Sequence, residues 1–172
     1  MITIISSTNR KNSYTKKIAE IYLSIFKKLN INAQIFDFQE LPNNFLFSSS
    51  YGNKTKEFES LINKYLINSE KYIFICPEYN GSIPGVLKSV IDCSDYRIYK
   101  SKKISIVGVS SGHAGNLRGI DHLTSILHHL GSEVFSVKPK LSNITTSFNN
   151  EQLSNKQQLD AIENHVKAFI AF

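Results

Sequence analysis

Apolar residues recur along the chain with two alternating periods. Short apolar runs at residues 2–5 and 72–76 are typical of strands, and the second run, apolar throughout, fits a strand covered on both faces. Between the runs, apolar residues stand three and four positions apart, as on one face of a helix. Strands are expected at residues 2–5, 33–38, 72–76, 104–109 and 134–137, and helices at 14–29, from Thr55, from Pro84, at 117–130 and from about Leu153.

This strict alternation of strands and helices predicts an α/β fold, with a parallel five-stranded sheet and helices on both of its faces. Two polar stretches, residues 39–53 and 139–150, are expected to be loops. The sequence contains no internal repeat and no linker-like segment. We therefore expect residues 1–172 to form one domain.

Composition places the chain among ordinary soluble proteins, with 41% hydrophobic and 20% charged residues. The apolar run at the N-terminus stops after Ile5, which is too short for a signal peptide. No segment approaches the length of a membrane span. Cys76 and Cys93 fit no metal-ligand spacing and are expected to be reduced thiols. These observations favour a cytoplasmic protein without membrane contact.

The net charge of +6 raises the question of nucleic-acid binding. The lysines are scattered, however, and their longest clusters are pairs such as Lys16-Lys17. No basic stripe with interleaved aromatic residues is present. The charge pattern therefore predicts no nucleic-acid partner, and a surface whose overall field favours small anions.

Ligands of open parallel sheets bind beyond the carboxyl ends of the strands, so the loops there are the candidate site. The loop after the first strand, residues 6–15, holds hydroxyls, an amide and two cations just before a helix, a combination that suits phosphate. Arg10 could pair with phosphate oxygens. The loop has neither a Walker A motif nor the dinucleotide-binding glycines. Without those glycines, Asp37 at the end of the second strand is expected to be a surface carboxylate rather than a ribose ligand.

Two further loops follow the third and fourth strands. In residues 76–85, Asn80-Gly81 forms a turn, Tyr79 could lie against a flat ring, and Glu78 is expected to be structural. In residues 110–116, two glycines permit close approach of the backbone to a ligand. We expect His113 to face solvent there. The adjacent His128 and His129 point to different helix faces and make a poor metal pair.

The three loops together resemble the NADPH-dependent FMN reductase family, which includes quinone, azo-dye and chromate reductases. The similarity is closest over the segment 77–92, which reads PEYNGSIPGVLKSVID. The first loop is similar to the family pattern Gly-Ser-x-Arg-x-x-Ser, with Ser7 and Thr8 in the first two places. The third loop is similar at 110–112, and Cys93 stands where the family often has tryptophan.

The resemblance implies a flavodoxin-like three-layer sandwich with strand order 2-1-3-4-5. It also implies an FMN site made by three groups of residues. Thr8, Arg10, Ser13, Tyr14 and Thr15 would surround the phosphate; Pro77, Glu78, Tyr79, Asn80 and Gly81 would flank the isoalloxazine; Ser110 and Gly112 would close its far side. Members of the family usually form homodimers or homotetramers, and the helix from Pro84 is the candidate interface.

The function implied is an NAD(P)H-dependent oxidoreductase that passes electrons from NADPH or NADH through FMN to a small-molecule acceptor, such as a quinone, azo compound or flavin. A ping-pong order is expected, with no catalytic side chain. Two alternatives stay open. A flavodoxin-type electron carrier is disfavoured by the basic net charge and by the 77–82 loop. A flavin-free interaction module is suggested only by Ser7 in the glycine place.

Overall fold

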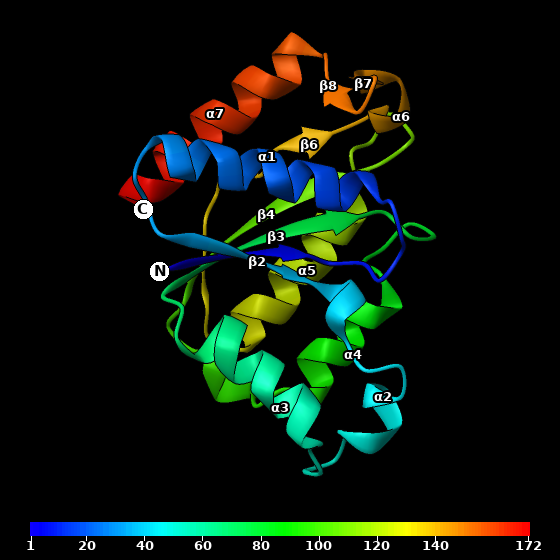
Figure 1. The fold of residues 1–172 in the computed structure, drawn as a ribbon, viewed down its shortest axis with the longest axis vertical. Coiled ribbons are helices and arrows are strands. Elements are labelled where there is room, and N and C mark those ends of the chain that lie inside the picture. Colours follow the sequence, from blue (N-terminus) through cyan, green and yellow to red (C-terminus); the bar gives the residue numbers. More distant parts are fainter.

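The structure, a computed structural model, describes residues 1–172. Its centre is a parallel sheet with the strand order β2-β1-β3-β4-β5, which confirms the expected flavodoxin-like order (Figure 1). The strands are β1 (Ile2–Ser6), β2 (Ala33–Asp37), β3 (Lys71–Pro77), β4 (Lys103–Val109) and β5 (Glu133–Val134). In register, Ser6 lies between Asp37 and Ile75, so the neighbouring strands end at the same edge.

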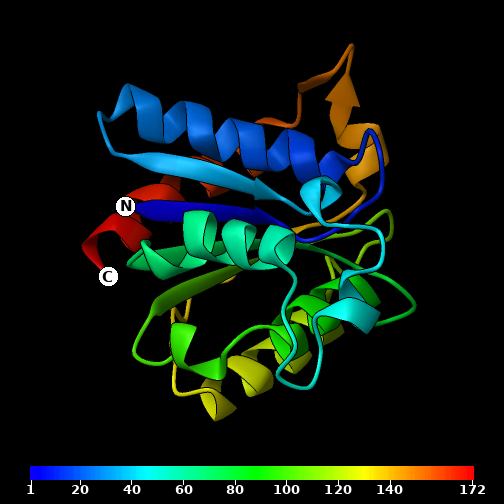
Figure 2. The same ribbon diagram turned by 60° about the horizontal axis from the view of Figure 1, so that its bottom comes forward.

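Helices cover both faces of this sheet, as the alternating pattern predicts. On one face lie α1 (Tyr14–Lys28) and α7 (Lys156–Ala171). On the other lie α3 (Lys56–Ile62), α4 (Gly85–Cys93) and α5 (Leu117–His129), so the molecule has three layers (Figures 1 and 2). None of the helices combines the length and the apolar character needed to cross a membrane.

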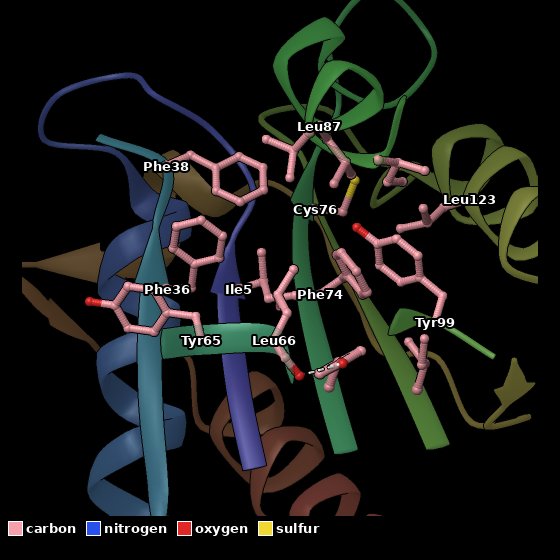
Figure 3. Packing of buried hydrophobic residues seen from close by; sticks show 14 of the residues in the cluster. Ile5, Phe36, Phe38, Tyr65, Leu66, Phe74, Cys76, Leu87, Tyr99 and Leu123 are labelled. Atoms are coloured by element: carbon pink, nitrogen blue, oxygen red, sulfur yellow. Dashed lines mark hydrogen bonds between the residues drawn. The ribbon is translucent and has the colours of Figure 1, made fainter. Parts of the chain in front are cut away.

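Each face of the sheet has its own hydrophobic core, because successive strand residues point to opposite sides. Ile4 packs with α1 and α7, whereas its neighbour Ile5 belongs to the core beneath α3, α4 and α5. Figure 3 shows this second core, which is rich in aromatic rings. Phe36 and Tyr65 stack there with ring centroids 4.7 Å apart.

The fifth strand differs from the expected range 134–137. β5 pairs with the beginning of β4, a separate strand β6 (Lys140–Leu141) pairs with its end, and residues 135–139 run between them. Phe135 turns into the α7 face, where its ring lies 5.8 Å from that of Phe169. The apolar run therefore serves packing against α7 as well as the sheet.

Two stretches expected to be loops contain short elements. Residues 39–53 include the end of a 3-10 helix η1 (Phe38–Glu40) and α2 (Phe45–Ser48), which is anchored by the buried ring of Phe45. Residues 139–150 include β6, α6 (Ile144–Ser147) and β7 (Phe148–Asn149). A π-helical turn η2 (Asn63–Ile67) follows α3, and a second 3-10 helix η3 (Tyr96–Ile98) follows α4.

The last helix begins later than expected. Leu153 belongs to β8 (Gln152–Leu153), which pairs with Phe148 of β7 in a hairpin. The helix α7 starts at Lys156 because Asn155 caps it, accepting a hydrogen bond from the N–H of Gln158 at 3.2 Å. The expectation for Asp37 was also wrong in part. Its carboxylate is buried rather than on the surface. It accepts a hydrogen bond from Gln39 N–H and pairs with Lys16 Nζ at 3.0 Å.

Candidate functional site

Three loops meet at the carboxyl edge of the sheet and enclose a cleft. They follow β1, β3 and β4, as expected for an open parallel sheet. The cleft is lined by Arg10, Asn12, Ser13, Tyr14, Thr15, Pro77, Glu78, Tyr79, Val109, Ser110, Ser111, Ile144 and Thr145. Eight of the twelve residues implied by the family resemblance are among them. Segments far apart in the sequence therefore form one concave site.

The loop after β1 offers unpaired donors to this cleft. Ser13 caps α1 by accepting a hydrogen bond from Lys16 N–H at 3.2 Å. The backbone N–H groups of Tyr14 and Thr15, in the first turn of α1, have no partner within the protein, nor does the Thr15 hydroxyl. Arg10 is exposed and forms no ion pair. Free N–H groups at a helix N-terminus, with a hydroxyl and a guanidinium beside them, suit an anion such as phosphate.

Ser7 takes the place of a glycine without strain. Its φ is outside the left-handed region. Its N–H donates to the carbonyl of Ile75 at 3.1 Å, and its buried side chain donates to the carbonyl of Ile5. The serine side chain is therefore absorbed by the end of β1 and is not among the residues that line the cleft.

Thr8 lies beneath the cleft rather than in its wall. Its side chain is buried, and its Oγ1 lies 2.6 Å from the hydroxyl of Tyr79. The same Oγ1 accepts a hydrogen bond from the Arg10 N–H at 3.2 Å. Thr8 therefore ties the loop after β1 to the loop after β3, and fixes Tyr79 at the cleft wall.

The loop after β3 is a tight turn. Tyr79 and Ser82 exchange two backbone hydrogen bonds of 3.0 and 3.1 Å around Asn80 (φ 52°) and Gly81 (φ 76°). Two consecutive positive φ angles are typical of an Asn-Gly turn. Glu78 is held to the sheet by its N–H, which donates to the carbonyl of Val109 at 2.8 Å. Its carboxylate lines the cleft and makes no hydrogen bond or ion pair within the protein.

The loop after β4 is braced from within. Ser110 Oγ donates to the carbonyl of Gly112 at 2.8 Å and accepts from Gly115 N–H at 3.0 Å. Asn116 caps α5 and also donates to the carbonyl of Cys76 at 3.0 Å. Two features require a glycine at position 115: its φ is +59°, and a Cβ there would lie 2.5 Å from the Cβ of Lys140. The loop is thereby presented in one conformation.

The four implied residues that do not line this cleft have other places. Thr8 lies below it, whereas Asn80, Gly81 and Gly112 line an adjoining hollow. As expected, His113 is exposed, at the rim of that hollow. Sequence reasoning missed Ile144 and Thr145, which come from α6, and Arg118 in the hollow. The α6 residues lie in a stretch that reads as a polar loop, so no local signal could have placed them here.

Comparison with known proteins decides the family. The model of the family described as NADPH-dependent FMN reductase matches residues 1–144, which include all three loops. The chain belongs to the NADPH-dependent FMN reductase family. It is accordingly an NAD(P)H-dependent flavin oxidoreductase, with FMN as its cofactor.

Two curated relatives of this FMN reductase family member carry related activities in their names. An FMN-dependent NADPH-azoreductase of Staphylococcus aureus is 29% identical over 130 residues, which cover 74% of this chain and 69% of the relative. A 2-hydroxy-1,4-benzoquinone reductase of a Burkholderia species is 25% identical over 133 residues, 75% of this chain and 70% of the relative. Both names describe reductases of small molecules.

Solved structures support the same fold. FerB, an NAD(P)H:(acceptor) oxidoreductase from Paracoccus denitrificans, superposes with a TM-score of 0.80 at 20% identity, covering 99% of this chain and 94% of FerB. A flavodoxin from Megasphaera elsdenii superposes with a TM-score of 0.58 at 12% identity, covering 95% and 99%. The reductase is thus flavodoxin-like in architecture.

The chemistry of the cleft fits FMN. At one end it has unpaired N–H groups that can donate hydrogen bonds to a phosphate. At the other end it has the ring of Tyr79 and the backbone of two loops. No thiol nucleophile competes there, because complete burial raises the pKa of Cys76 to about 12. The cleft therefore offers binding and orientation, and leaves electron transfer to the cofactor.

Proposed function

We propose that this reductase transfers two electrons from NADPH or NADH to a quinone, an azo compound or free flavin by a ping-pong order. One observation carries the proposal. The free N–H groups of Tyr14 and Thr15, which suit a phosphate, border the same cleft as the ring of Tyr79. The chain has no dinucleotide-binding glycine motif, so the nicotinamide has no separate site of that kind. Donor and acceptor would then use the same opening in turn.

The proposed site residues form two groups, one for the phosphate of FMN and one for its isoalloxazine. Arg10, Ser13, Tyr14 and Thr15 would hold the FMN phosphate, with Thr8 acting through its contacts to Arg10 and Tyr79. The isoalloxazine would lie among two further groups, Pro77, Glu78, Tyr79, Asn80 and Gly81 from one loop and Ser110 and Gly112 from the other. This assignment follows the lining of the cleft and its adjoining hollow.

FMN, when bound, supplies the hydride-transfer chemistry. The protein's part is to orient the nicotinamide and the acceptor and to stabilise developing charge. The N–H groups of Ser111 and Gly112 have no partner within the protein, and such preorganised donors stabilise negative charge beside a ring. The balance is simple: NAD(P)H gives up two electrons and one proton, and a quinone takes these with one further proton from water. No side chain acts as a nucleophile.

Steady-state kinetics test this proposal. Initial rates of NADPH oxidation should be measured against menadione at several fixed concentrations of each substrate. Parallel lines in double-reciprocal plots are expected. Intersecting lines would contradict the ping-pong order, and an FMN-loaded protein that oxidises no NADPH would be an electron carrier instead.

We also propose that the reductase forms a homodimer or homotetramer through the face around α4. Phe47 and Tyr51 are 90% and 101% exposed, an unusual state for aromatic side chains, and their segment packs beside α4 through Leu46 and Cys93. Light scattering at micromolar concentration should give at least twice the chain mass, and Phe47→Ser should lower it. A monomeric wild-type protein would contradict this.

A further inference from the structure

A second hollow adjoins the cleft on the side of α5. It lies between the turn after β3 and the segment that leads from β4 into α5. Glu78, Ser110 and Ser111 line both spaces, so the two are continuous. A molecule stacked on a flavin ring in the cleft could therefore extend a substituent toward the α5 side of the hollow, which Arg118 lines.

The hollow has a cation that the protein itself does not neutralise. Arg118 lines it and forms no hydrogen bond or ion pair through its guanidinium. Its Nη1 would lie 3.9 Å from a Cβ built on Gly81, so the side chain lies along the turn rather than away from it. Glu78 is the carboxylate that lines the hollow, and it does not pair with Arg118. Asp121, one turn further along α5, does not pair with it either.

Backbone N–H groups in the segment that lines the hollow have no partner within the protein. The N–H groups of His113 and Ala114, which follow the two residues proposed to face the flavin ring, donate to no protein acceptor. The N–H of Arg118, in the first turn of α5, is likewise unpaired. Consecutive free N–H groups beside a guanidinium form a concavity that suits an oxyanion.

The position of this cation is set by its helix. His122, one turn after Arg118 on α5, has its Nδ1 2.7 Å from Ser82 Oγ, which fixes α5 against the turn after β3. The backbone of Arg118 is thereby placed beside the hollow, while its exposed guanidinium has no partner within the protein. The chain thus presents a placed cation beside the reductase cleft.

We propose that this hollow binds an anionic group of the molecule that is reduced or oxidised in the adjoining cleft, with Arg118 as its main cationic ligand. The inference rests on the proposed function of the cleft. The shared chemistry is an oxyanion, which could be a phosphate of the nicotinamide dinucleotide or an acid substituent of the acceptor. Arg118 is then a specificity-determining residue, separate from the residues proposed for the FMN phosphate.

The test compares Arg118→Gln with Arg118→Lys and with Lys100→Gln, an equal charge change at an exposed lysine at the opposite edge of the sheet. NADP+, NAD+, menadione and a sulfonated naphthoquinone are titrated into each FMN-loaded protein by calorimetry. Steady-state KM values for NADPH, NADH and both quinones accompany the titrations. Affinity for FMN itself is measured separately on the apoprotein.

Arg118→Gln should raise Kd and KM on the order of tenfold for the molecule whose anion is held, with kcat nearly unchanged. Arg118→Lys should restore part of the affinity, and Lys100→Gln should have no effect. A rise for both nicotinamides points to their shared pyrophosphate, a rise for NADP+ and NADPH alone to the 2′-phosphate, and a rise for the sulfonated quinone alone to the acceptor.

Unchanged affinity for all four molecules in Arg118→Gln would overturn the inference. Failure of the proposed function is distinguishable from this result. A wild-type protein that holds FMN but oxidises no NADPH would contradict the proposed function, while the titrations with NADP+ and the sulfonated naphthoquinone would still decide whether Arg118 binds their anions.

Discussion

A buried histidine makes the stability of this fold sensitive to mild acid. His165 of α7 is 2% exposed, and each ring nitrogen meets a hydroxyl. Tyr22 OH lies 2.9 Å from Nδ1 and Ser105 Oγ lies 2.6 Å from Nε2. No charged group contacts the ring, which stacks on Phe169. Burial therefore lowers the pKa of His165 from 6.5 to about 4.

The sign of the pH effect follows from proton binding. Between pH 6.5 and 4 the unfolded chain binds a proton at His165 and the folded protein does not, so acid favours unfolding. From the two pKa values, the free energy of unfolding should fall by about 2 kcal/mol between pH 7 and pH 5 and by about 3 kcal/mol by pH 4 from this residue alone. Well above pH 6.5 His165 is neutral in both states and contributes no pH dependence.

Urea unfolding of the wild type and of His165→Gln at pH 7 and pH 5 measures this contribution. Glutamine keeps a donor and an acceptor but does not titrate, so carboxylates elsewhere contribute equally to both proteins. The wild type should lose about 2 kcal/mol more than the variant over this interval. Equal losses in the two proteins would refute the assignment of a neutral, buried His165.

Two further predictions concern the loops around the cleft. Thr8→Val and Tyr79→Phe should each weaken FMN binding, and a double-mutant cycle on the FMN Kd should give a coupling of about 1 kcal/mol; additive losses would contradict a direct link between them. Gly108→Ala should lower the thermal midpoint and the free energy of unfolding, the latter by about 1–3 kcal/mol, because the new Cβ would lie 2.1 Å from the Gly115 carbonyl oxygen. The control Gly85→Ala places its Cβ in open space and should not lower the midpoint. Equal midpoints in the two variants would contradict the packing argument.

The layers of the fold could be predicted because long apolar periods dominate local preferences. Strands such as β3 and helices such as α5 have both the right period and clear ends. The fifth strand could not be placed correctly, since the chain leaves β4 after the Phe135 N–H donates to the carbonyl of Ile104 at 2.8 Å, and the ring of Phe135 packs against α7. The start of α7 was misplaced for a similar reason, because Leu153 pairs with Phe148 across a hairpin.

The candidate site was predictable where a loop follows a strand directly. The loops after β1, β3 and β4 converge because parallel strands end at one edge. Contributions from α6 and from Arg118 were not predictable, since they depend on how α6 and α5 fold back toward that edge. The ion pair of Asp37 was equally hidden, because its partner Lys16 lies in the first turn of α1.

We propose that the loop after β1 holds the phosphate of FMN. The most direct test of this proposal is a fluorescence titration of the apoprotein with FMN and with riboflavin, which lacks the phosphate, in the wild type, in Arg10→Ala and in the charge-matched control Lys28→Ala. The wild type and the control should bind FMN at least about tenfold more tightly than riboflavin, and Arg10→Ala should lose most of this difference. Equal affinities for FMN and riboflavin in the wild type, or no bound flavin at micromolar concentration, would contradict it.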